Sequence, residues 1–307
     1  MLSVIIPAYN EEAMLAKTRA EVAATLDAAG IEHELLFVDD GSTDRTWEEI
    51  LACARQDRRV RGLRFSRNFG KEAAICAGLQ DCRGDCCVVL DCDLQHPPEK
   101  IVEMYRLWEQ GYEIVEAVKK DRGRESALHR LCARAFYRLI SRAAKIDMSR
   151  ASDFKLLDRK AILVLVNMKE QNAFFRALSS WIGFRTAQVE FEVQPRAAGE
   201  SKWSTRALIR YAMTNITSFS SFPMQVITFL GVLTFAVSLV LGIVALVQKF
   251  SGTAVEGFTT VIILQLLFSS IIMVSLGIIG YYLAQVYEEL KGRPKFIVSE
   301  SCGETKE

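Results

Sequence analysis

The sequence lacks several features that mark common protein classes. Its 307 residues carry 38 Lys and Arg against 37 Asp and Glu, so there is no charge excess of the kind that attracts nucleic acid. No C-x-x-C pair occurs among the eight cysteines. Several of them lie in apolar runs, where a reduced thiol behaves as a small hydrophobic side chain, and we expect a reducing compartment. The alternative is a zinc site, which strand geometry disfavours, built from Cys82, Cys86, Cys87 and Cys92.

Two nucleotide-binding motifs are also missing. No G-x-G-x-x-G follows the first apolar run, and no G-x-x-x-x-G-K-S/T occurs anywhere in the chain. These absences disfavour both the usual dinucleotide-binding fold and a P-loop NTPase. A nucleotide must therefore be bound in another way.

Charged side chains are absent from two long stretches near the C-terminus. No Asp, Glu, Lys or Arg occurs between Arg210 and Lys249, and none occurs from Gly257 to Tyr287. Each stretch exceeds the roughly 20 residues that a helix needs to cross the bilayer core. We predict a hairpin of two membrane-spanning helices. The alternative is a pair of long helices buried in a soluble protein.

These stretches divide the chain into four expected parts. They are a domain at residues 1–203, an amphipathic segment at 204–223, the hairpin at 224–287 with spans 226–247 and 260–283, and a tail at 288–307. Basic residues flank the hairpin, whereas its connecting loop offers only Lys249. The positive-inside rule therefore predicts an integral protein of the cytoplasmic (inner) membrane with both termini cytoplasmic. The amphipathic segment lies either among anionic headgroups or on the soluble domain as an ordinary helix.

The first 203 residues alternate short β-rich runs with helix-like segments. The runs are 2–6, 35–38, 60–65, 86–90 and 113–117, and the helical segments are 11–29, 43–57, 71–81 and 97–110. This alternation predicts an α/β fold with a mostly parallel sheet covered by helices on both faces. Ligands of such sheets bind beyond the carboxyl ends of the strands.

Polar residues gather where four of these runs end. Helix capping explains each polar loop singly but does not explain four together. The loops are Pro7–Glu12, Asp39–Asp44, Ser66–Glu72 and Asp91–Asp93. We therefore expect a binding site at this edge of the sheet.

Asp91 and Asp93 are spaced i and i+2 at the end of an apolar run. Both carboxylates can turn toward one cation if the chain leaves the strand between them. Mg²⁺ commonly joins one or two carboxylates to substrate phosphates, and Gln95 offers a third oxygen directly or through water. The pair is thus expected to hold a metal against a diphosphate. Two solvated loop acids are the alternative.

Six motifs in order make the chain recognisable. They are Pro7-Ala-Tyr-Asn-Glu11, Val38-Asp-Asp-Gly-Ser-Thr-Asp44, Arg64-Phe-Ser-Arg-Asn-Phe-Gly-Lys71, Asp91-Cys-Asp-Leu-Gln95, Ser152-Asp-Phe-Lys155 and Gly199-Glu-Ser-Lys-Trp203. With the hairpin, they make the chain resemble the polyprenyl-phosphate glycosyltransferases of the inverting family 2 type, which include bactoprenol glucosyltransferase and dolichol-phosphate mannosyltransferase. The resemblance covers nearly the whole chain. It implies a GT-A fold, a nucleotide-sugar donor, Mg²⁺ or Mn²⁺, and a polyprenyl phosphate acceptor at the cytoplasmic leaflet.

The resemblance also implies roles for individual residues. Those matching the nucleotide-sugar site are Pro7, Tyr9, Glu11, Asp40, Lys71 and Asp91. Those matching the metal site are Asp91, Asp93 and Gln95, and the catalytic acids are Asp153 and Asp93. Candidates for the acceptor phosphate are Arg122, Arg134 and Lys202. A solvated helix face is the alternative for the two arginines, and an interfacial anchor is the alternative for the lysine.

The implied reaction is the inverting transfer of a hexose to the phosphate of undecaprenyl phosphate. Our expected donor is UDP-glucose, with GDP-mannose or another UDP-sugar left open. The family pattern casts Asp153 as a base. However, a phosphate monoester with a second pKa of about 6 is already mostly dianionic near neutrality. We therefore expect Asp153 to orient the sugar or acceptor, or to stabilise the developing cation.

Three other interpretations compete with this one. A processive polysaccharide synthase would show a Q-x-x-R-W motif and more membrane helices. A non-catalytic membrane-anchored scaffold would not need the intact acids. A transporter would need a polar path across the membrane, which one uncharged hairpin lacks unless several chains assemble. The hairpins do offer a surface through which homo-oligomers could form.

His96 stands where the family commonly has Asp. It either alters the metal or pH preference of the site or is a plain loop histidine.

Overall fold

A computed structural model describes residues 1–119, 152–168, 175–192, 222–251 and 257–303. The chain divides into two compact units. One comprises Met1–Ile209 together with Arg293–Glu307, and the other comprises Arg210–Gly292.

The described part of the first unit contains a mixed eight-stranded sheet in the order β7-β5-β6-β4-β1-β2-β3-β8. Its strands are β1 Leu2–Ala8, β2 His33–Asp39, β3 Val60–Phe65, β4 Cys86–Val89, β5 Ile114–Lys119, β6 Lys155–Asp158, β7 Thr186–Phe191 and β8 Val298–Cys302. The central strands β4, β1, β2 and β3 are parallel to their neighbours in this group. Strand β6 runs antiparallel to both β4 and β5, and β8 runs antiparallel to β3. The predicted α/β fold with a parallel core is confirmed.

Helices follow the strands, and the first four of them lie where the sequence pattern predicts helices. They are α1 Leu15–Ala28, α2 Thr46–Gln56, α3 Lys71–Asp81, α4 Glu99–Glu109, α6 Arg159–Val166 and α7 Phe175–Trp181. For the elements before β6, the predicted ends differ from the observed ends by up to four residues. The sequence pattern did not anticipate β6, β7, β8, α6 or α7.

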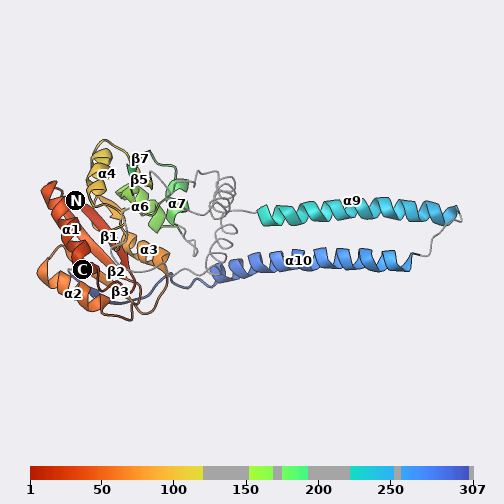
Figure 1. Cartoon of the computed structure of the whole chain (residues 1–307), viewed down its shortest axis with the longest axis horizontal. Coiled ribbons are helices and arrows are strands. Elements are labelled where there is room, and N and C mark those ends of the chain that lie inside the picture. The colour runs from red at the N-terminus through yellow and green to blue at the C-terminus, as the bar shows by residue number, and fades with distance from the viewer. Residues whose placement is uncertain (120–151, 169–174, 193–221, 252–256, 304–307) are drawn as a thin grey trace. The chain divides into compact units, whose positions relative to one another are not determined.

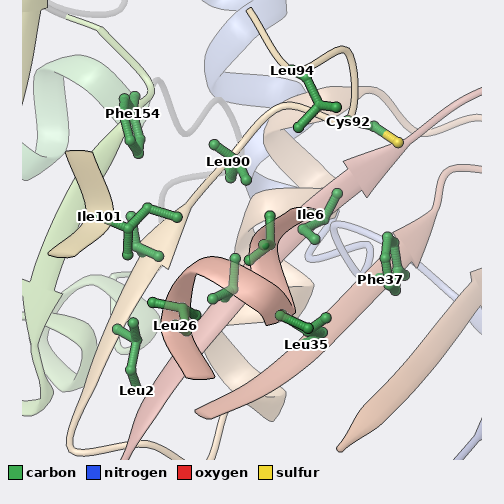
Figure 2. Close-up of a cluster of buried hydrophobic side chains, with 14 of the residues drawn as sticks. Leu2, Ile6, Leu26, Leu35, Phe37, Leu90, Cys92, Leu94, Ile101 and Phe154 are labelled. Carbon is green, nitrogen blue, oxygen red and sulfur yellow. The ribbon is translucent and has the colours of Figure 1, made fainter. Parts of the chain in front are cut away.

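Side-chain alternation along β1 explains why both faces of the sheet are covered. Leu2, Val4 and Ile6 join a cluster with buried residues of α1, α2 and α4. Figure 2 shows part of this cluster, including Leu26 of α1. Ile5 points to the other face, where α3 packs on β1. A Cβ added at Gly78 of α3 would lie 2.3 Å from Ile5 Cγ2, so glycine lets this helix approach the sheet. Each fully buried aliphatic side chain contributes about 1.5–3 kcal/mol to this packing.

The strand register brings the polar loops to one edge. Ala8 is paired with Asp39, Asp39 with Arg64, and Ile5 with Val89. Because the four strands are parallel, their carboxyl ends emerge together. The loops that follow β1, β2, β3 and β4 therefore share the edge at which the sequence predicts a ligand site.

The cysteines of the alternative zinc site lie in the core. Cys82, Cys86, Cys87 and Cys92 are all buried with free thiols. Burial raises the pKa of the Cys92 thiol to about 12, which keeps it protonated. Among the residues that the structure describes, no group of three His, Cys, Asp or Glu side chains is arranged to hold a metal. The zinc interpretation therefore has no structural support.

The second unit contains two long apolar helices, α9 Phe222–Phe250 and α10 Phe258–Leu290, which contact each other (Figure 1). The stretches Met224–Val244 and Leu267–Leu290 have mean hydropathies of 2.5 and 1.9. Both are long and apolar enough to cross a membrane. By length and composition, these two helices could form the predicted transmembrane hairpin.

Candidate active site

The loops after β1 and β2 are tied together by polar side chains. The Asn10 N–H donates to Ser42 Oγ at 2.9 Å, and the Thr43 N–H donates to Asn10 Oδ1 at 2.9 Å. Asn10 has a φ of 55°, a left-handed conformation that asparagine tolerates better than most residues. The Glu11 N–H donates to Thr46 Oγ1 at 2.9 Å. The motif residues of each loop thus satisfy backbone and side-chain groups of the other loop. These hydrogen bonds hold the two loops together at the edge of the sheet.

Asp40 connects the second loop to the third. Its carboxylate is buried and accepts the Phe69 N–H at 2.7 Å and the Gly70 N–H at 2.9 Å. Burial raises the pKa of Asp40 above its usual range, although the two N–H groups oppose this shift. The neighbouring Gly41 has a φ of 67°, and a Cβ there would lie 2.4 Å from the Arg67 carbonyl carbon. Only glycine permits this approach of the two loops.

The predicted metal pair lies in the loop after β4. Asp91 and Asp93 are both partly exposed, and Asp93 Oδ1 accepts the Gln95 N–H at 3.1 Å. Leu94, which lies between Asp93 and Gln95, has a φ of 54°. The chain therefore leaves the strand direction at this residue. Asp91 Oδ1 is 2.6 Å from the Lys71 ammonium. This loop contains two carboxylates and one amide. Such oxygens suit Mg²⁺ or Mn²⁺, and a cation of this kind also binds phosphate oxygens and water.

Asp153 lies at the centre of an ion-pair network. Its side chain is 6% exposed. Oδ2 is 2.9 Å from Lys71 Nζ and 2.8 Å from Arg176 Nη2, and Oδ1 is 2.6 Å from Arg176 Nε. Burial alone would raise the pKa of Asp153, but Lys71 and Arg176 hold it well below its usual range. Asp153 is therefore a carboxylate fixed by two cations.

Lys71 joins this network to the metal pair. Its ammonium contacts both Asp91, which follows β4, and Asp153, which precedes β6. The side chain of Lys71 is 41% exposed; partial desolvation of its ammonium lowers the pKa of Lys71, but the two carboxylates raise it above its usual range. The lysine therefore stays charged. It brings the carboxylates predicted for metal binding and for catalysis within reach of one side chain.

Sequence analysis gave no role to Glu72, the last residue of the polar loop Ser66–Glu72, and it missed Arg176 altogether. Burial and the nearby charge of Asp153 raise the pKa of Glu72 to about 7, although the N–H of Phe175, donating to Oε2 at 2.9 Å, opposes the shift. Arg176 is the second residue of α7 and grips Asp153 with two nitrogens. No local motif marks either residue, because their partners lie in distant parts of the chain.

Lys155, a residue of the Ser152–Lys155 motif, lies beneath the network. Its side chain is fully buried, and Nζ is 2.5 Å from Glu116 Oε1. Nζ also donates to the hydroxyls of Ser179 and Ser180 at 2.9 and 3.1 Å and to the Arg176 carbonyl at 3.3 Å. Burial lowers the pKa of Lys155, against the influence of Glu116. A charged lysine at this depth is tolerated because its donors are all used.

Of the remaining predicted residues, some are described by the structure and others lie outside the described residues. Pro7 lies in β1, and Tyr9 and Glu11 lie in the loop that follows, where Tyr9 is 40% exposed. His96 is buried and stacks on Phe154 with ring centroids 4.9 Å apart. This packing is that of a core side chain. The three acceptor-phosphate candidates lie outside the described residues, and they are Arg122, Arg134 and Lys202.

Comparison with known proteins places the chain in a family. Residues 3–165 match Glycosyl transferase family 2. The chain is 39% identical to the uncharacterized glycosyltransferase YkcC of Bacillus subtilis, with 98% of this chain and 94% of that protein covered. It is 33% identical to the SfII prophage-derived bactoprenol glucosyl transferase of Shigella flexneri, with 98% of each covered.

A solved structure supports the same fold. The crystal structure of a mycobacterial protein aligns with a TM-score of 0.50 at 20% identity, covering 71% of this chain and 74% of that one. The sheet with its helices is of the GT-A type. The chain belongs to glycosyltransferase family 2.

Proposed function

We propose that this protein transfers a hexose from a nucleotide sugar to the phosphate of a polyprenyl phosphate, with UDP-glucose as donor and undecaprenyl phosphate as acceptor. One observation carries the proposal. The Lys71 ammonium joins Asp91, 2.6 Å away, to Asp153, 2.9 Å away, so the donor and reaction centres share one cation. Relatives named bactoprenol glucosyl transferase, at 33% identity, support the lipid acceptor and the glucosyl group.

Asp91, Asp93 and Gln95 are the residues that would hold Mg²⁺ or Mn²⁺. Their oxygens suit a hard divalent cation, and the pairing of Asp91 with the Lys71 ammonium supports a carboxylate that is ionised at this position. When bound, the cation supplies charge stabilisation to the leaving diphosphate. Pro7, Tyr9, Glu11 and Asp40 would surround the nucleotide, since their loops emerge at the same edge of the sheet.

The reaction forms a bond between an acceptor phosphate oxygen and the anomeric carbon, and it breaks the bond from that carbon to the diphosphate. The configuration inverts because the two oxygens lie on opposite sides of the carbon. A dianionic acceptor carries no proton that must be removed. A general base works best with a pKa near the operating pH, whereas Lys71 and Arg176 keep the pKa of Asp153 far below it. Asp153 therefore orients the sugar or acceptor, or stabilises the positive charge that develops on the sugar.

A membrane hairpin gives this reaction a physical advantage. The polyprenyl tail stays in the bilayer while its phosphate reaches the interface. An enzyme anchored by α9 and α10 shares that surface with its acceptor, which raises the effective acceptor concentration. The proposal includes an inner-membrane location, a cytoplasmic catalytic domain at residues 1–203, and a cytoplasmic tail at 288–307.

The test is product formation by the purified full-length protein. Undecaprenyl phosphate, Mg²⁺ or Mn²⁺ and a panel of nucleotide sugars would be incubated with the protein and with an Asp93→Asn control. Mass spectrometry should detect polyprenyl-phosphate hexose from UDP-glucose and far less from the control. Product from GDP-mannose or another UDP-sugar alone would correct the donor. No product from any donor, despite metal-dependent nucleotide binding, would overturn the proposal in favour of a non-catalytic binding protein.

A further inference from the structure

Arg176 is held at both its ends. Its guanidinium contacts both carboxylate oxygens of Asp153, at 2.6 and 2.8 Å. Its backbone carbonyl accepts from the buried Lys155 ammonium at 3.3 Å. Asp153 and Lys155 are two residues apart at the start of β6, so one short segment grips both the side chain and the main chain of Arg176.

A second contact fixes the helix that carries Arg176. The first N–H groups of a helix have no partner within the helix. In α7 the Phe175 N–H donates to Glu72 Oε2 at 2.9 Å. Glu72 follows Lys71 at the start of α3. The same turn of α3 therefore supplies Lys71 to Asp153 and also anchors the residue next to Arg176.

The underside of α7 is fixed as well. Ser179 and Ser180 both receive hydrogen bonds from Lys155, and Ser180 Oγ lies 3.1 Å from Glu116 Oε1. Removing one partner of a buried ion pair leaves an uncompensated charge in the core, which is strongly unfavourable. The cluster therefore determines where α7 lies on the sheet.

The two cations do not act on Asp153 in the same way. Lys71 is a point charge that contacts Oδ2, whereas Arg176 is a planar group that contacts both oxygens. A two-point contact of this kind fixes the plane of the carboxylate, and a single ammonium does not. Orientation of Asp153 thus depends on Arg176.

We propose that Arg176 is a positioning residue of the transfer reaction, which holds the plane of the Asp153 carboxylate against the sugar or acceptor. This inference rests on the proposed function. It assigns Arg176 to the chemical step and not to nucleotide binding. A purely structural ion pair between α7 and the segment before β6 would instead lower the stability of the fold. It would then change the chemical step and nucleotide binding to the same extent.

The experiment compares Arg176→Met, Arg176→Lys, Asp153→Asn and the Arg176→Met/Asp153→Asn double variant in the full-length protein. Misplacement of a reacting group by about 1 Å costs up to roughly 100-fold, so Arg176→Met should lower kcat about 10- to 100-fold. UDP affinity should change less than about twofold, since a positioning role in the chemical step leaves ground-state binding of the nucleotide largely intact. Arg176→Lys should recover part of kcat. The double variant should be no slower than Asp153→Asn, because Arg176 acts through Asp153.

Several results would overturn the inference. The first is an unchanged kcat in Arg176→Met. The second is a double variant whose loss of kcat equals the product of the two single losses. The third is an Arg176→Met variant that loses kcat and UDP affinity to the same extent. A wild-type protein without product overturns the proposed function and this inference with it, whereas wild-type product with normal Arg176 variants overturns the inference alone. Arg58→Met, at an exposed residue before β3, is the matched control.

A second pair of variants covers the case in which Arg176→Met does not fold. Glu72→Gln keeps an oxygen that accepts the Phe175 N–H, whereas Glu72→Ala removes it. If α7 positions Arg176, Glu72→Ala should lose more kcat than Glu72→Gln, with similar UDP affinity in both. Equal kcat in the two variants would contradict the inference.

Discussion

Lys71 and Asp153 form an ion pair, with Nζ 2.9 Å from Oδ2, across 82 positions of sequence. The same ammonium is 2.6 Å from Asp91 Oδ1. One side chain therefore joins the residue predicted for the reaction centre to a residue predicted for the metal site. We expect both the chemical step and the binding of metal and nucleotide to depend on this shared cation.

Lys71→Met should lower kcat/KM by about 100- to 1,000-fold, because Asp91 and Asp153 would lose a shared cation in the site and preorganised electrostatic contacts are worth this much. Lys71→Arg should retain more activity, since it keeps the charge. Steady-state kinetics with purified protein measures both. Lys17→Met, at an exposed residue of α1, serves as control. Near-normal kcat/KM in Lys71→Met would show that the ion pair is not used in catalysis.

Asp153→Asn should lose activity at every pH from about 6 to 9. The wild-type group is a carboxylate throughout this range, because Lys71 and Arg176 keep its pKa well below the usual value for Asp. Since a dianionic acceptor needs no base, raising the pH should not restore the variant. A pH series of kcat measures this. Full recovery of Asp153→Asn at high pH would establish Asp153 as a base.

Asp93→Asn should weaken metal-dependent UDP binding. The change replaces a charged oxygen with a neutral amide at a position expected to bind a hard cation. Titration calorimetry of UDP at several Mn²⁺ concentrations should show about tenfold weaker binding at low metal and partial recovery at high metal. Asp85→Asn, at an exposed residue of the opposite edge, is the control. Equal metal dependence in Asp93→Asn and wild type would remove Asp93 from the metal site.

Glu72 should make folding stability depend on pH in an unusual direction. Its folded pKa is raised to about 7, from an ordinary value of 4.5, by burial and by Asp153. The folded state therefore binds more protons than the unfolded state between these values, and stability falls as pH rises through this window. Glu72→Gln lacks this titration. Its Tm should rise relative to wild type between pH 5 and 7.5, and a pH-independent difference would contradict the raised pKa.

Phe296→Ala should weaken nucleotide binding, although Phe296 itself lies outside the four polar loops. Its ring stacks on Phe65 at 5.1 Å, and Phe65 contacts Phe69 edge-on at 5.7 Å. The Phe69 N–H in turn binds Asp40. Losing an aromatic pair worth about 0.5–1.5 kcal/mol should raise the UDP Kd two- to tenfold. Val298→Ala, at a nearby exposed residue, should leave the Kd unchanged, and an unchanged Kd in Phe296→Ala would disprove the connection.

Local sequence patterns were enough to predict the elements of the parallel core and the edge of the candidate site. Apolar runs of strand length and helical segments between them reveal local structure directly. Parallel strands then place their carboxyl ends together, so the order of residues alone predicts that the loops containing Tyr9, Asp40 and Asp91 lie at one edge and form the candidate site. The two uncharged stretches likewise revealed the apolar helices α9 and α10 from length and composition alone.

Local patterns do not predict which side chains meet, because those contacts depend on long-range packing. Antiparallel β6, the edge strand β8 and helix α7 are placed by long-range pairing, which periodicity does not encode. Arg176 and Glu72 become part of the site because burial obliges each charged or polar group to find a partner. That partner is set by the packing of α7 against α3 and β6, not by spacing along the chain. Local sequence thus determines the elements, while the desolvation of charge determines the contacts among them.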